Sequence, residues 1–174
     1  MKTLSRYAVV LLGLAVPVAL SAAEPAKAPV RTEVVFEKPE NFTDVKDGEM
    51  GSDRGRDGIL EQIREFIVER AEKALPAGQK LTVTFSDIDL VGEYEPWRGP
   101  QFSDVRIVKS IYPPRFKFSY KITDAAGKIV KEGKEDLRDL AFDMRLTIDR
   151  QDPLRFEKDI LKDWISEATR APKA

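Results

Sequence analysis

Residues 81–90 constrain the fold of this chain more than any other segment. Apolar and hydroxyl-bearing side chains alternate from 81 to 85, with Leu81, Val83 and Phe85 on one face, which is typical of a half-buried β-strand. The alternation then slips by one residue, and Ile88 takes over the apolar face. Because a one-residue slip turns every later side chain over, the sequence predicts a β-bulge or kink near Ser86–Asp87.

We expect this segment to be an interior strand, with Val83 and Phe85 packed against helices, because no proline interrupts it before Pro96. Two amphipathic segments predict those helices: apolar residues recur at helical spacing over 59–75 and again over 156–168. Trp164 is expected to reach the same core. The expected boundary residues are Asp57 and Pro76 for the first helix, and Asp152 and Pro153 for the second.

Further alternating segments predict more strands. They are 31–37, 105–111, 115–122 and 128–134, the last two joined by a hairpin turn at 124–127, and 140–148, whose first residues could instead form a helical turn. The stretch 41–57 is polar and Gly-rich and is expected to be a mobile loop. The order β-α-β-β-β-(β)-α predicts an α+β fold, in which a mostly antiparallel sheet is covered on one face by two helices.

The first 23 residues have the composition of a secretory signal peptide. Lys2 and Arg6 precede an apolar run over 8–20, and Ser21–Ala23 supplies the small residues of a signal-peptidase site. The run is shorter than the about 20 residues that span a bilayer. We therefore expect cleavage between residues 23 and 24, a flexible lead-in over 24–30, one domain over 31–170 and no membrane span after cleavage; a retained membrane anchor is the alternative.

Composition excludes several classes of enzyme. The chain has no histidine and no cysteine, so it cannot build a serine–histidine triad, a thiolate nucleophile or a usual zinc site. Two of the 29 Lys and Arg lie in the leader, which leaves 27 against 30 Asp and Glu and a mature net charge of −3. This balance does not favour a nucleic-acid partner. We expect no cofactor.

Four carboxylates lie within nine residues: Asp87, Asp89, Glu93 and Glu95. Alternate spacing puts Asp87 and Asp89 on one face of a strand, about 6.5–7 Å apart, which could suit two acids acting on a glycosidic bond or oxygen ligands for Ca²⁺. The pair lacks the glycine and the distal glutamate of an EF-hand loop. We favour a solvated strand end whose aspartates accept backbone hydrogen bonds, and expect no metal site and no catalytic residue.

Trp97 and Arg98, between Pro96 and Gly99, are a second candidate for binding. Tryptophan and arginine are enriched where interfaces bind tightly, so the pair could contact a partner protein or a glycan. The alternative, which the sequence favours, is that Trp97 folds back as a lid over the sheet edge and stacks on Arg98 or Tyr94.

Several short motifs follow one another along the chain. They are Val34-Val35-Phe36 with Pro39, Asn41-Phe42-Thr43-Asp44, Asp87-Ile88-Asp89-Leu90 before Glu95-Pro96-Trp97, Asp104-Val105-Arg106, Tyr112-Pro113-Pro114-Arg115, Leu137-Arg138-Asp139-Leu140, and Phe156-Glu157-Lys158 before Trp164. The set resembles a family of exported proteins from Gram-negative bacteria that is catalogued only as a domain of unknown function. The resemblance covers nearly the whole mature chain. It implies a periplasmic location and supplies no activity, cofactor or site residue.

The sequence thus predicts a soluble periplasmic binding or envelope-accessory protein without catalytic activity of its own. Its partner would be an envelope protein or a glycan. The candidate binding residues are Asp87, Asp89, Glu93, Glu95, Trp97 and Arg98. Two alternatives stay open: a carboxylate-based hydrolase that acts on envelope glycan, and a Ca²⁺-binding module that uses the acidic loop 87–95.

Overall fold

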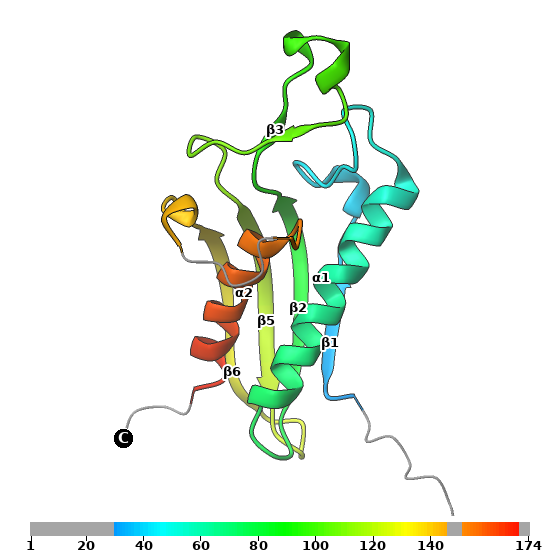
Figure 1. Ribbon diagram of the computed structural model, residues 1–174. Coiled ribbons are helices and arrows are strands. Elements are labelled where there is room, and N and C mark those ends of the chain that lie inside the picture. The colour runs from blue at the N-terminus through cyan, green and yellow to red at the C-terminus, as the bar shows by residue number, and fades with distance from the viewer. Residues whose placement is uncertain (1–29, 146–150, 171–174) are drawn as a thin grey trace, which may run out of the picture.

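A four-stranded sheet and two helices form the body of the protein in the computed structural model, which describes residues 30–145 and 151–170 (Figure 1). The elements of the body are β1 (Thr32–Phe36), α1 (Asp53–Ala74), β2 (Lys80–Asp89), β5 (Arg115–Thr123), β6 (Ile129–Arg138) and α2 (Arg155–Ala168). The strand order is β1-β2-β5-β6, with β1 parallel to β2 and the other neighbours antiparallel. Both helices cover the same face of the sheet, so the predicted α+β fold is confirmed.

The predicted leader and most of the lead-in lie outside the described residues, as does the end of the segment predicted at 140–148. Within the described residues, no helix is long and apolar enough to cross a membrane.

β2 is the interior strand around which the core packs, as predicted. Leu81, Val83 and Phe85 point toward the helices and are almost completely buried. The pairing register with β5 shifts between Phe85 and Asp87, which is the predicted β-bulge. The shift returns Ile88 to the buried face, so both halves of the strand contribute to one core.

Aromatic rings connect the sheet to α2. The ring of Phe85 lies 5.0 Å from that of Phe118 on β5, and Phe118 lies 4.6 Å from Trp164 on α2 in an edge-to-face arrangement. Trp164 therefore reaches the same core as β2, as predicted.

Both helices begin at other residues than predicted. Ser52, not Asp57, is the N-cap of α1: its hydroxyl accepts the N–H of Gly55 at 2.9 Å. The prediction was wrong because the first turn of α1 is polar and carries no apolar stripe. Asp152 accepts the N–H of Leu154 at 2.8 Å. α2 begins at Arg155, two residues after the expected first residue Pro153.

The predicted strand at 105–111 is absent from the main sheet, and residues 140–145, the described part of the segment predicted at 140–148, add no strand to it. Of residues 105–111 only β4 (Arg106–Ile107) is extended, and it pairs with the short β3 (Glu93–Tyr94). β6 runs on to Arg138, past the predicted end at 134, and the described part of 140–148 contains a 3-10 turn, η4 (Phe142–Met144). Phe142 is buried against Phe156 of α2, whereas the alternate residues Leu140 and Met144 are exposed. The alternation of apolar residues in this segment therefore did not predict which of them are buried, because only the ring of Phe142 packs against α2.

Candidate functional site

Residues 91–112 form a lobe beyond the end of the sheet, here called the apical lobe (Figure 1). It contains β3, β4 and two 3-10 turns, η2 (Pro96–Arg98) and η3 (Pro100–Phe102). Gly92 begins it with φ 80°, and a side chain there would lie 2.8 Å from the carbonyl oxygen of Ile107. Only glycine allows both this backbone conformation and the close approach of the two arms of the lobe.

Arg106 joins the apical lobe to the loop before α1. Its guanidinium donates to both carboxylate oxygens of Asp44, at 2.8 and 3.2 Å, and to the carbonyl oxygens of Gly92 and Lys46. It also lies 4.5 Å from the centre of the Tyr94 ring. Burial opposes the charge of Arg106, but the hydrogen bonds to Asp44 raise its pKa. The ion pair is largely buried, so loss of either partner would leave an unpaired charge at the root of the lobe.

The polar loop that carries Asp44 is itself fixed to the sheet. The N–H of Asp44 donates to the carbonyl oxygen of Ile88 at 3.1 Å, and the N–H of Leu90 donates to the carbonyl oxygen of Asp44 at 3.0 Å. These bonds continue the parallel pairing of β2 beyond the end of β1. The predicted loop at 41–57 is therefore shorter than expected, because α1 begins at Asp53, and it has a defined anchor.

Glu95 occupies the interior of the apical lobe. Its side chain is 1% exposed and accepts hydrogen bonds from Arg98, from Lys109 at 2.5 Å and from the hydroxyl of Tyr112 at 3.2 Å. The hydrogen bond from Lys109 is the main cause that lowers the pKa of Glu95. We call these four residues the Glu95 cluster. Two predicted binding residues, the buried Glu95 and the exposed Arg98, are thus paired with each other.

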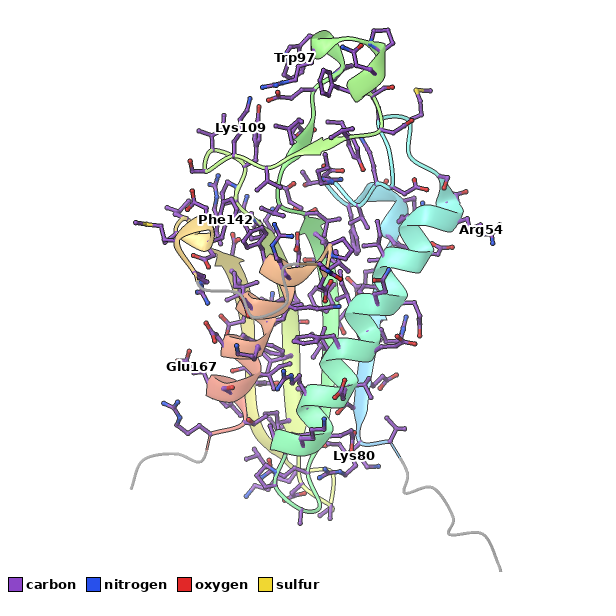
Figure 2. All side chains as sticks on the ribbon, in the orientation of Figure 1. Arg54, Lys80, Trp97, Lys109, Phe142 and Glu167 are labelled. Carbon is purple, nitrogen blue, oxygen red and sulfur yellow. The ribbon has the colours of Figure 1, made fainter. Side chains whose placement is uncertain are left out.

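Trp97 lies at the tip of the apical lobe and is 71% exposed (Figure 2). The expected lid over the sheet edge is therefore wrong for Trp97. Other large apolar side chains of the lobe are also exposed: Val105, Val108 and Ile111. Met50, in the loop before α1, is also exposed. This loop contacts the lobe, because the N–H of Glu49 donates to the carbonyl oxygen of Ser103.

Asp87 and Asp89 lie at the end of β2 and face the uncovered side of the sheet, opposite Lys117 and Arg115 of β5. Asp87 accepts the N–H and the hydroxyl of Thr43, at 2.9 and 3.1 Å, and the ammonium of Lys117 at 3.2 Å. Partial burial opposes ionisation, but these bonds lower its pKa. Asp89 differs: burial, followed by the charges of Asp44, Asp87 and Glu93, raises its pKa to about 6.

The four predicted carboxylates do not converge on one point. Asp87 is engaged by Thr43 and Lys117, and Glu95 lies inside the lobe. Within residues 30–145 and 151–170, no group of three or more potential ligand side chains could hold a metal ion. Four surface hollows of about 330 to 580 Å³ are lined by other residues than Asp87 and Asp89.

A comparison of the sequence with models of protein families identifies the family of this chain. A family model described as Protein of unknown function (DUF3016) matches residues 30–167. The chain belongs to this family. The resemblance seen in the sequence is thus confirmed, and the DUF3016 match extends from just before β1 to the last turn of α2. No curated protein and no solved structure matches the chain.

Glu157 is a buried acid of the DUF3016 domain that the sequence analysis did not single out as a functional residue. It is 1% exposed, and one carboxylate oxygen accepts the N–H of Val91 at 2.7 Å. The other oxygen has no hydrogen-bond partner among residues 30–145 and 151–170. Burial raises its pKa. Glu157 thus links α2 to the root of the apical lobe. Its spacing from Leu161 and Trp164, which puts an acid on the buried stripe of α2, was the signal that could have found it.

Proposed function

We propose that this protein is a periplasmic binding or envelope-accessory protein without catalytic activity of its own, and that its apical lobe contacts the partner. The exposure of Trp97 at the tip of the lobe carries this proposal. Tryptophan is among the residues most enriched at the centres of tight interfaces.

The apical lobe inverts the ordinary distribution of polar and apolar side chains. Its carboxylate Glu95 and its guanidinium Arg106 are largely buried, whereas Trp97 and Ile111 are 71% and 69% exposed. The lobe exposes four large apolar side chains, and a surface rich in such side chains is typical of interaction sites. Burying charge in order to present apolar groups is reasonable for a lobe that binds.

The Glu95 cluster holds η2 in place before any partner arrives. Glu95 precedes η2, and its carboxylate accepts hydrogen bonds from Arg98, the last residue of η2, and from Lys109, which lies beyond β4. A surface that is already ordered loses less conformational entropy on binding, so more of the contact energy appears as affinity.

An envelope protein fits this surface better than a glycan does. A lone tryptophan could stack on a sugar ring, but Val105, Val108 and Ile111 offer branched aliphatic contacts without hydrogen-bonding groups. The leader at residues 1–23 supports export.

The test is capture of envelope proteins from a native periplasmic extract by immobilised mature protein. We expect Trp97→Ala to lose the protein that the parent captures. Leu140→Ala is the matched control, because it truncates a large apolar side chain that is 69% exposed, close to the 71% of Trp97, and that lies outside the lobe. Capture of the same protein at the same yield by Trp97→Ala would refute a binding role for the lobe.

One observation favours a second candidate, a hydrolase that uses two carboxylates. The pKa values of Asp87 and Asp89 are displaced in opposite directions, as in enzymes where one acid donates a proton and a neighbouring carboxylate stays charged. Against it, Asp87 is engaged by Lys117 and neither residue lines a described hollow. Turnover of envelope glycan by the purified protein, abolished by Asp89→Asn, would establish this function in place of the first.

A further inference from the structure

β6 is an open edge of the sheet. It is ten residues long, and in residues 30–145 and 151–170 no group outside β5 donates to or accepts from its backbone. The opposite edge, β1, has only five residues, and the guanidinium of Arg64 donates to the carbonyl oxygen of Val34. An unpaired strand of this length is a template for pairing with another strand.

The register of β6 with β5 is continuous from Lys131 to Arg138, and no proline interrupts it. Prolines, bulges and charged side chains, lysine above all, are the usual devices that prevent edge strands from pairing. β6 has one irregularity of this kind, where its register with β5 shifts between Ile129 and Lys131. The centre of β6 carries charges of alternating sign. It reads Lys131, Glu132, Gly133, Lys134 and Glu135.

This order of charges is complementary to itself when the strand is reversed. If two copies run antiparallel about a twofold axis at Gly133, Lys131 faces Glu135 of the other copy and Glu132 faces Lys134. The four pairs among these charged residues are then of opposite charge, which stabilises an antiparallel pair. Lys131 also donates to the carbonyl oxygens of Glu167 and Ala168 at the end of α2, so Glu132 and Lys134 carry most of the complementarity.

Neighbouring registers lose this complementarity. Moving the axis by one residue toward the N-terminus places Glu132 opposite Glu132 of the other copy, and moving it by one residue the other way places Lys134 opposite Lys134 of the other copy. The charge pattern therefore selects the register centred on Gly133 over both of its neighbours.

We infer that β6 is a self-association surface, on which a second copy of this chain pairs antiparallel about Gly133. The two sheets become one sheet of eight strands, and each open edge covers the other. An isologous contact of this kind closes on itself and forms a dimer, not a fibre.

The pairing also joins two hollows. The largest one, about 580 Å³, lies on the uncovered face of the sheet and is lined by residues that include Thr84, Ser119, Glu132, Gly133 and Lys134. Because the twofold axis passes through Gly133, the hollows of the two copies meet there as one trough.

The test measures self-association of the mature protein by sedimentation velocity over a concentration series. The parent is expected to form dimers. Glu132→Lys and Lys134→Glu each place two like-charge pairs across the axis, and each is expected to weaken dimerisation by about tenfold or more. Glu33→Lys is the matched control, with the same charge change on the same face of the sheet but on β1. Equal melting temperatures show that the variants are folded.

A mixture of the two single variants gives the sharpest result. The chain with Glu at both 132 and 134 then faces a chain with Lys at both positions, so every pair at these positions regains opposite charge. We expect the mixture to form a heterodimer and the double variant Glu132→Lys/Lys134→Glu to regain the homodimer. A parent that stays monomeric at every concentration, single variants that dimerise like the parent, or a mixture that stays monomeric would each overturn the inference.

Discussion

Replacement of Asp89 by asparagine is expected to stabilise the protein at neutral pH. Asp89 is half-buried among the charges of Asp44, Asp87 and Glu93, with Arg106 as the opposing charge. Arg115 lies opposite on β5, but its guanidinium is hydrogen-bonded to Asp136 at 2.6 and 2.7 Å. The folded protein therefore favours the protonated form of the Asp89 carboxyl group over its ionised form.

The sign of the pH dependence follows from the pKa. Folding raises the pKa of Asp89 from 3.8 to about 6, so the folded state binds the proton more tightly. The stability gained from this is fully present below pH 3.8 and is lost as the pH rises through about 6. A shift of two pKa units corresponds to about 3 kcal/mol, which solvent screening at a half-exposed site reduces to about 1 kcal/mol.

Urea unfolding of the parent and Asp89→Asn at about pH 5 and about pH 7.5 measures the effect. The difference between the two proteins cancels the titration of other groups, including Glu157. We expect the variant to be more stable by about 1 kcal/mol at the higher pH, and the difference to shrink at the lower pH. Asp87→Asn is the matched control and should destabilise, because the bonds from Thr43 and Lys117 lower the pKa of Asp87. If Asp89→Asn is less stable than the parent at about pH 7.5, the reasoning is refuted.

Three further predictions concern packing, capping and the apical lobe. Phe85→Ala should lower the free energy of unfolding by about 3–5 kcal/mol and Trp97→Ala by under about 0.5 kcal/mol, because the first ring is buried and the second exposed; equal shifts of the urea midpoints would contradict this. Ser52→Ala should cost about 1 kcal/mol and Asp57→Ala much less in thermal unfolding, since only Ser52 caps α1. Glu95→Gln should speed amide hydrogen exchange in residues 91–112 more than in β2, because Arg98 and Lys109 lose their shared counter-ion; an unchanged lobe would show that the Glu95 cluster is not what orders it.

The elements whose sequence period reflects burial could be predicted. β2 shows both its buried face and its bulge in the order of its residues, because Phe85 and Ile88 must reach the same core across one extra residue. The buried face of α2, which contains Trp164, could also be predicted from the helical spacing of its apolar residues. The described part of the segment at 140–148 follows the other alternative, a helical turn: it forms η4, in which Phe142 is buried and Met144 exposed, so the alternation of apolar residues did not reflect burial there.

The apical lobe could not be built from local pattern. Asp44 and Arg106 are 62 residues apart in the chain, so their ion pair follows only from the folded arrangement. Sequence proximity also grouped Glu95 with Trp97 and Arg98 as a binding surface, whereas the fold buries the Glu95 carboxylate and leaves the other two side chains exposed. Neighbours in a turn can point in opposite directions, and no period of two or 3.6 residues describes such a turn.

Photo-crosslinking from the tip of the lobe tests the proposed binding role most directly. A photoreactive amino acid replaces Trp97 in the native bacterium, and the same residue placed at Leu140 serves as the control. The expected result is one discrete crosslinked envelope protein from position 97 and none from position 140. Absence of a crosslink at position 97, or the same products from both positions, would contradict the proposal that the apical lobe is the binding surface.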